Sequence, residues 1–463
     1  MLYNFIEGVK MKSFNYNELT GKIITKESKE YDKSILSWNR DIKRFPLAIV
    51  YCYNEIDVIN AIKWSSKYSL EFRIRSGSHS YEGFSTGDNI LIIDISNLKN
   101  IEINEEELYV KLGAGVVNSE AYEALGNIGY AFPGGGCPTV GVSGLILGGG
   151  WGYSSRYLGL ACDSLIEAEI INYKGEKLIL NNEENRDLFW AIQGSGGASF
   201  GVITSVKLRL KEKVDSGTLI YINYPNISEE EIVEIINELQ KLYKNLDRKI
   251  NLKTSIYNSN LNGRGVKLIG LFYGNSKEAK EILKDLLSIT KNIEVNIEDK
   301  SIFECNKWIQ DSHPDFEKYK STGRFVYKDY SKDEILKFIN IIDSKNNGCT
   351  YTAITFYGLG GAVSDIEKEE TAFYYRDAKF ILGFQAVWED DIYSEENKAW
   401  LIDKFKIIKK LTVGSFVNFP LKELEDYEKE YYGENMYKLR KIKEKYDPNN
   451  IFKHPQSISC MQE

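Results

Sequence analysis

The sequence predicts an α+β protein of two or three packed units, and three observations lead to this class. The chain has 463 residues, which is too long for one ordinary domain. Residues 45–112 alternate short β-rich runs with helical ones, which is typical of a βαβ arrangement. After residue 214 long charged helices are interspersed with strand-like runs. We therefore expect a second unit with an antiparallel sheet backed by helices.

Residues 46–175 contain well-defined predicted elements. Short β-rich runs predict strands at residues 46–53, 71–75, 90–96 and 108–115. An amphipathic helix is predicted over 55–68, and a further helix is opened by Asn118 or Ser119. The glycine-rich segment 133–152 follows, and we expect neither an ordinary helix nor a strand there. Next comes a predicted hairpin that turns at Lys174-Gly175.

The second half has longer helices. Charged helical patterns lie at residues 228–246 and 277–290, and strand-like runs lie at 266–273, 351–358 and 379–388. The tail, residues 431–452, is predicted as one helix that ends at Asp447-Pro448.

Composition argues against several classes of protein. With 59 basic and 67 acidic residues the net charge is −8, which is unlike a nucleic-acid-binding protein. The sequence contains no run of eighteen apolar residues, so we expect no membrane helix. The N-terminus lacks the features of a signal peptide. The six cysteines are scattered without a CxxC pair, which favours a reduced, cytoplasmic setting. Oligomeric state has no signature in the sequence.

Common catalytic motifs are absent or incomplete. Residues 197–201 match G-x-S-x-G, but a strand rather than a helix follows the serine, which argues against a serine hydrolase. Gly113-x-Gly115 and Gly194-x-Gly196 do not extend to a dinucleotide fingerprint. The three histidines are dispersed, so we expect no metal site.

Two unusual segments remain. The first, residues 75–83, follows a strand and presents His79 among small residues whose backbone N–H groups can form a concave site for a pyrophosphate. The second, residues 134–144, presents Cys137 on a glycine-rich backbone that can approach a ligand closely. A single loop histidine is commonly a surface group and a single cysteine is commonly packed and inert. Two glycine-rich loops that each offer one of the few soft nucleophiles in the chain favour a functional role over a coincidence.

These segments resemble the berberine bridge enzyme-like branch of the vanillyl-alcohol oxidase / p-cresol methylhydroxylase flavoprotein superfamily. The similarity rests on RSGSHSYEG, on PGGGCPTVGVSG with its cysteine 58 positions after His79, on RDLFWAIQGSGGASFGVIT, and on the segment from YYGEN to Ile458. It implies a two-part FAD-binding domain of the PCMH/VAO type over residues 1–213. A substrate domain over 214–414 and a C-terminal segment over 415–463 that returns to the FAD domain are implied as well.

The resemblance also implies that His79 bonds the flavin 8α-methyl group and Cys137 bonds C6. A neutral imidazole and a thiolate are side-chain nucleophiles suited to an electron-poor ring. Val140 occupies the position of a gatekeeper beside the flavin, where valine accompanies reactivity with oxygen. The remaining implied FAD contacts are Gly77, Ser78, Ser80, Gly141, Ser143, Gly144, Ile203 and Asn435.

The implied activity is oxidation of a small-molecule alcohol or hemiacetal, in a carbohydrate or a secondary metabolite, with O2 as acceptor. The proton acceptor is open, because Phe416 and Phe419 stand where many relatives carry the tyrosines of a Tyr-x-Asn-Tyr element. Tyr81 and Tyr375 are the candidates, with Arg376 as a cation that would assist Tyr375. The alternatives are a dehydrogenase with another electron acceptor, and a flavin- or carbohydrate-binding protein without turnover.

Overall fold

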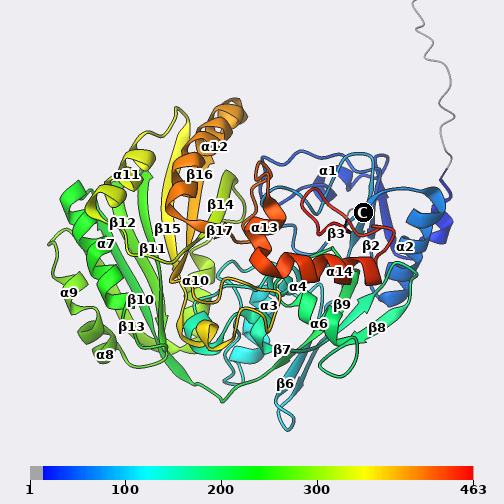
Figure 1. The fold of residues 1–463 in the computed structure, drawn as a ribbon, viewed down its shortest axis with the longest axis horizontal. Coiled ribbons are helices and arrows are strands. Elements are labelled where there is room, and N and C mark those ends of the chain that lie inside the picture. Colours follow the sequence, from blue (N-terminus) through cyan, green and yellow to red (C-terminus); the bar gives the residue numbers. More distant parts are fainter. Residues whose placement is uncertain (1–13, 462–463) are drawn as a thin grey trace, which may run out of the picture.

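The structure, a computed structural model, describes residues 14–461, and three β-sheets organise this part of the chain (Figure 1). The first sheet has the order β1-β2-β4-β3, with β3 and β2 both parallel to β4. Its strands are β1 (Lys22–Thr25), β2 (Ala48–Tyr51), β3 (Phe72–Arg75) and β4 (Leu91–Asp94). Helix α2 (Glu55–Tyr68) connects β2 to β3 and begins where the Asn54 side chain accepts a hydrogen bond from the Asp57 N–H. The predicted βαβ order is confirmed.

The second sheet is antiparallel, in the order β5-β6-β9-β7-β8. Its strands are β5 (Ile101–Asn104), β6 (Tyr109–Gly113), β7 (Leu165–Ile171), β8 (Lys177–Leu180) and β9 (Val202–Arg209). The hairpin of β7 and β8 turns at Gly175, whose φ of 77° suits glycine. Helix α6 (Arg186–Ile192) precedes β9.

The third sheet has eight antiparallel strands in the order β13-β10-β12-β11-β15-β16-β14-β17. They are β10 (Ser216–Pro225), β11 (Ile250–Ser259), β12 (Gly263–Phe272), β13 (Glu294–Ser301), β14 (Lys318–Val326), β15 (Cys349–Gly358), β16 (Phe380–Trp388) and β17 (Val413–Ser415). Helices α7 (Glu229–Tyr243), α11 (Lys332–Asp343) and α12 (Ser394–Leu411) pack on this sheet in the left half of Figure 1. The predicted α+β class is confirmed, while the predicted domain bounds stay a prediction.

Two predictions for local elements were wrong. The glycine-rich segment contains a short helix, α4 (Val142–Leu147), because the glycines cluster on either side of a run of apolar residues. The tail is two helices, α13 (Tyr427–Tyr432) and α14 (Met436–Tyr446), rather than one. Gly433 separates them with a φ of 51°, and a Cβ there would lie 2.4 Å from the ring of Tyr374. Close packing against Tyr374 therefore interrupts the helix.

Helix α3 (Asn118–Gly126) begins at Asn118 with Val117 as its N-cap. Asn118 is buried and its amide donates to the carbonyl oxygen of Cys137 at 2.9 Å. The residue that the sequence suggested as a helix start thus holds the Cys137 loop.

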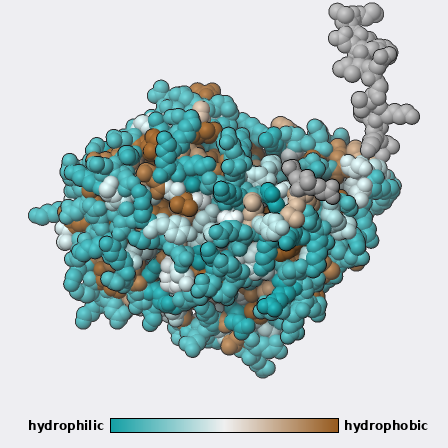
Figure 2. All heavy atoms as spheres, viewed as in Figure 1, coloured by the Kyte–Doolittle hydropathy of each residue, from teal (hydrophilic) through white to brown (hydrophobic). Residues whose placement is uncertain are grey.

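The surface seen in Figure 2 is mainly hydrophilic, with hydrophobic residues scattered over it. Within residues 14–461 no helix has the length and apolar character needed to cross a bilayer.

Candidate flavin and substrate site

A cavity of about 1120 Å³ lies where loops of the first two sheets face the third sheet. The loops contribute residues of the segments 76–85, 135–153 and 195–203. The sheet contributes polar and aromatic side chains from β11, β12, β14, β15 and β16. A volume above the roughly 300–1,000 Å³ of a single small-ligand site is suited to a cofactor together with a substrate.

The loop after β3 presents backbone donors to this cavity. Arg75 anchors its start through a buried ion pair with Asp94, with 2.5 Å between Nε and Oδ2. Ser78 takes a left-handed φ of 60°, which turns successive N–H groups toward one concave surface. Within residues 14–461 nothing accepts a hydrogen bond from the N–H groups of residues 77–80. These unpaired backbone N–H groups are suited to binding an anionic group of a cofactor, such as the pyrophosphate of FAD.

The two nucleophile-bearing loops are in direct contact. A Cβ on Gly77 would lie 2.4 Å from the Gly141 nitrogen and 2.7 Å from the Thr139 oxygen, so only glycine permits this approach. A Cβ on Gly144 would meet nothing within 4 Å, because this glycine faces the cavity. Glycine thus brings the loops together at one point and leaves room for a ligand at the other.

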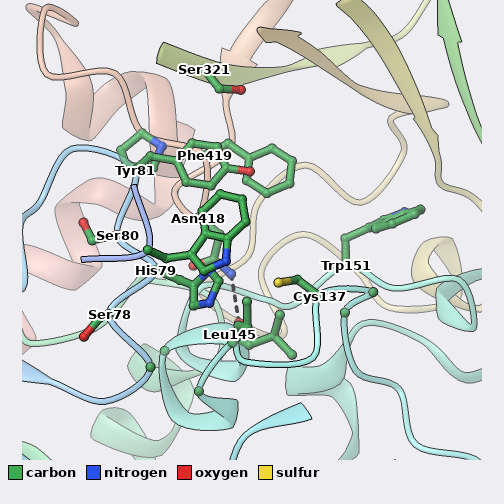
Figure 3. A pocket seen from close by; sticks show the side chains of 18 of the residues that line it. Ser78, His79, Ser80, Tyr81, Cys137, Leu145, Trp151, Ser321, Asn418 and Phe419 are labelled. Atoms are coloured by element: carbon green, nitrogen blue, oxygen red, sulfur yellow. Dashed lines mark hydrogen bonds between the residues drawn. The ribbon is translucent and has the colours of Figure 1, made fainter. Parts of the chain in front are cut away.

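His79 and Cys137 point into the same part of the cavity (Figure 3). Nε2 of His79 lies 2.7 Å from Oγ1 of Thr139, and Sγ of Cys137 lies 3.9 Å from the same oxygen. The distance between Nε2 of His79 and Sγ of Cys137 therefore cannot exceed the sum of these two distances. Such a distance is suited to two positions on one flavin ring system. Trp38 stacks on the imidazole with 5.1 Å between ring centroids and fixes its plane.

Burial sets the protonation of both groups. It lowers the pKa of His79 to about 4, with a smaller contribution from His313, so the imidazole is neutral near pH 7. Burial raises the pKa of Cys137, and the Thr139 N–H and the charge of Lys253 oppose this rise. The histidine is thus ready as a nucleophile, whereas the cysteine depends on its neighbours to ionise.

Most of the residues predicted to contact FAD lie in this cavity. The lining includes Gly77, Ser78, His79, Ser80, Cys137, Val140, Gly141, Ser143, Gly144 and Ile203. Asn435 is not among the described lining residues; it is buried and donates to the carbonyl oxygens of Lys368 and Thr371. From the same segment Tyr432 reaches the cavity and donates to the Ser195 carbonyl at 2.7 Å.

Tyr375 also lies outside the described cavity lining. Its hydroxyl donates to the Glu430 carbonyl at 2.6 Å, and its ring stacks on Phe325. Arg376 forms a buried bidentate ion pair with Asp163 rather than assisting a phenol in the cavity. The expectation that Tyr375 handles the substrate proton does not fit this placement.

Tyr81 lines the cavity and stacks on Phe419, with 5.1 Å between centroids and 6° between planes (Figure 3). Burial raises its pKa well above 10, so its phenol is suited to donating a hydrogen bond rather than accepting a proton. Phe416 is fully buried behind Phe419 and packs on Phe325. Of the two missing phenols, only the one at position 419 would face the described lining.

A pair of glycines makes room for the aromatic lining. Gly323 and Gly383 are opposite each other in β14 and β16. A Cβ on Gly323 would lie 2.7 Å from the ring of Phe419, and one on Gly383 would lie 2.8 Å from the ring of Tyr357. The absence of both side chains lets the two rings lie on the sheet at the cavity wall.

Sequence reasoning missed the polar side chains that the third sheet and the residue before β14 supply to the cavity. They are Lys253, Ser255, Lys267, Glu317, Ser321, Thr355 and Gln385. The signal was the period of two in β11, where Lys253 and Ser255 alternate with the buried residues Leu252, Thr254 and Ile256. That alternation places polar residues on one face, but only the packing of the other face against helices shows which face is the cavity.

Comparison with known proteins identifies the family. Residues 46–181 match the family described as "FAD binding domain", and residues 415–459 match "Berberine and berberine like". The uncharacterized FAD-linked oxidoreductase YgaK of Bacillus subtilis is 32% identical over 448 residues, which cover 95% of this chain and 97% of the relative. The chain belongs to the berberine bridge enzyme-like FAD-linked oxidoreductases.

Other members of the berberine bridge enzyme-like family agree. Tetrahydroberberine oxidase of Berberis wilsoniae is 28% identical, over 89% of this chain and 85% of the relative. The solved structure of Physcomitrella patens BBE-like 1 has the same fold, with a TM-score of 0.89 at 24% identity over 96% of this chain and 98% of that chain. A xylooligosaccharide oxidase from Myceliophthora thermophila has a TM-score of 0.87 at 22% identity, over 96% and 98% of the two chains. The protein is an FAD-dependent oxidoreductase.

Proposed function

We propose that this oxidoreductase is an oxidase whose FAD is held by covalent bonds to both His79 and Cys137. Its substrate is an alcohol or hemiacetal of a carbohydrate or of a polar secondary metabolite. The observation that carries the proposal is the convergence of His79 and Cys137 on Thr139 in a cavity whose opposite wall is a polar sheet face.

FAD held in this cavity would supply a hydride acceptor and a route for the electrons to O2, with hydrogen peroxide as the product. The chain supplies the rest of the site. Glycines and free backbone donors of residues 77–80 are suited to binding the cofactor phosphates. Val140 lines the cavity near Cys137, and a small side chain there is consistent with access for oxygen.

Glu317 is the side chain best suited to accept the substrate hydroxyl proton. Its carboxylate faces the cavity and has no hydrogen bond or ion pair with any residue from 14 to 461. Its backbone accepts a hydrogen bond from the Arg40 N–H at 2.7 Å, beside Trp38, which stacks on His79. Burial raises the pKa of Glu317 to about 7, opposed by the charge of Lys253. A carboxylate with this pKa can accept a proton near neutrality.

Tyr81 would assist as a hydrogen-bond donor. Burial is the main cause of its raised pKa, and the charge of Glu317 adds to it. A phenol that stays protonated can orient a substrate oxygen while Glu317 takes the proton from the hydroxyl. In this arrangement Tyr81 orients the substrate oxygen and Glu317 holds the hydroxyl proton, while the bound cofactor would supply the hydride acceptor.

The test uses the purified protein. Acid-precipitated protein should stay yellow, and its intact mass should exceed that of the chain by one FAD. Turnover of a panel of sugars and alcohols should form hydrogen peroxide, and rapid mixing of the reduced protein with air should reoxidise it quickly. Very slow reoxidation would favour a dehydrogenase, and loss of all colour from the precipitate would overturn covalent attachment.

A further inference from the structure

Two lysines share the sheet face that forms the cavity wall. Lys253 of β11 is opposite Ile269 of β12, and Lys267 of β12 is opposite Ser255 of β11. The two lysines are therefore diagonal neighbours on one face, which separates their Cβ atoms by about 7–8 Å at most. Both line the cavity.

Neither ammonium group forms a direct ion pair within the described chain. No carboxylate of residues 14–461 lies within ion-pair distance of Lys253 or Lys267. Each ammonium group lies over an aromatic ring instead. Nζ of Lys253 is 5.4 Å from the ring centroid of Tyr357, and Nζ of Lys267 is 5.6 Å from that of Tyr257. Lys318, which also lines the cavity, differs because its Nζ lies 2.8 Å from Asp391.

This arrangement is unfavourable for the ligand-free protein. Burial and, to a smaller extent, the like charge of Lys267 lower the pKa of Lys253 to about 8, and the charge of Glu317 opposes this fall. Burial also lowers the pKa of Lys267. Buried charges are normally paired, since desolvation penalises an isolated one. An anion placed between the two ammonium groups would remove this cost.

The surroundings define the rest of the ligand. Ser255 and Thr355 hydrogen bond to each other at 2.9 Å across β11 and β15, and Gln385 lies on the same wall. Hydroxyl and amide groups of this kind suit a polyhydroxylated molecule, while the ring of Tyr357 offers an apolar face for a sugar ring. Glu317 is the inner carboxylate of the described lining, and Glu389 is exposed.

We propose that the substrate is an acidic carbohydrate whose carboxylate or phosphate is bound by Lys253 and Lys267. The proposal rests on the proposed function in taking this ligand as the molecule that is oxidised. The anion occupies the wall formed by β11 and β12, and a hydroxyl of the same molecule lies toward Glu317. Charge-assisted hydrogen bonds from both ammonium groups supply the specificity.

The experiment measures binding without turnover. FAD-loaded protein is reduced with dithionite under argon, and isothermal titration calorimetry follows D-glucuronate, D-glucose 6-phosphate and neutral D-glucose at pH 7 and low salt. At least one of the two anions should bind about tenfold or more tightly than glucose, as expected for hydrogen bonds to charged groups. The two anions distinguish a carboxylate from a phosphate as the preferred group.

Variants assign the preference to the lysines. Lys253→Met and Lys267→Met should each reduce the ratio of anion to glucose affinity by fivefold or more, because one of the two charges is lost. Lys318→Met is the matched control and should keep the ratio, because Asp391 already pairs with that lysine. If a variant does not fold, the native protein is titrated at pH 9.5 instead. Lys253 is largely neutral at that pH, so the ratio of anion to glucose affinity should fall.

The outcomes separate this inference from the proposed function. Equal affinity for all three ligands, or a preference unchanged by both lysine substitutions, would overturn the anion site while leaving oxidation intact. An anion that binds with the expected preference but forms no peroxide in air would support the anion site and count against the oxidase.

Discussion

Nε2 of His79 lies 2.7 Å from Oγ1 of Thr139, in a contact that joins the two loops bearing the predicted attachment residues. The same hydroxyl lies 3.9 Å from Sγ of Cys137, so one side chain orients both nucleophiles. Thr139→Val should therefore slow covalent incorporation of FAD into apoprotein by about tenfold, as followed by the yellow colour that survives acid precipitation. Thr139→Ser keeps the hydroxyl and should behave like the native protein. Equal rates for the valine and serine variants would contradict an orienting role.

Single substitutions of the attachment residues should each leave one bond. His79→Ala and Cys137→Ala are expected to retain FAD after denaturation, whereas the double variant should release it, because no nucleophile is left. Intact-mass spectrometry of the three variants makes the measurement. Release of FAD from either single variant would mean that the other residue forms no bond.

Glu317→Gln should lower kcat/KM by about 10²–10⁴-fold, the range for loss of a general base. Because burial raises the pKa of Glu317 to about 7, the native rate should increase as pH rises through that value, where the carboxylate becomes ionised and able to accept a proton. The glutamine variant should lose this rise. The exposed Glu389 at the cavity lining supplies the control, and Glu389→Gln should keep the native pH profile.

Tyr81→Phe should have a smaller effect than Glu317→Gln. Removing one neutral hydrogen bond lowers kcat/KM by roughly 2- to 10-fold, which corresponds to about 0.5–1.5 kcal/mol. The stack on Phe419 is kept, so FAD content and thermal stability should stay near native values. A loss as large as that of Glu317→Gln, together with loss of the pH dependence, would instead identify Tyr81 as the proton acceptor.

Asp163→Asn should destabilise the fold, because it leaves Arg376 buried without its carboxylate partner. The expected loss in the free energy of unfolding is about 3–5 kcal/mol, measured by urea denaturation followed by circular dichroism. Arg248→Met removes an exposed pair with Asp365 and should change stability by only about 0–1 kcal/mol. If the two substitutions changed the free energy of unfolding by similar amounts, burial of the Asp163–Arg376 pair would make no extra contribution to stability.

Local pattern was enough to predict many elements of the fold. The helix over 55–68 has the bounds of α2, because its apolar spacing and the capping Asn54 act within the segment itself. The turn at Gly175 is likewise local, since its φ requires glycine. The tail helix was predicted wrongly at Gly433 because a distant ring, that of Tyr374, determines the break.

The candidate site divides in the same way. His79 and Cys137 were found from the sequence, because a reactive side chain within a glycine-rich loop is a signal confined to a few neighbouring residues. Tyr375 and Asn435 lie outside the described cavity lining, because both hydrogen bond to backbone carbonyls of segments that come together only on folding, and their predicted roles stay predictions.

The sequence alone thus determined the class of cofactor, and it predicted His79 and Cys137 as the residues that hold it. Tertiary structure decided which side chains complete the cavity, because Lys253, Lys267 and Glu317 come from β11, β12 and the segment before β14, which are far from the flavin loops in the chain. These charged groups form no ion pair within residues 14–461, and only sheet pairing and burial bring them together. It is this juxtaposition that points to an acidic substrate.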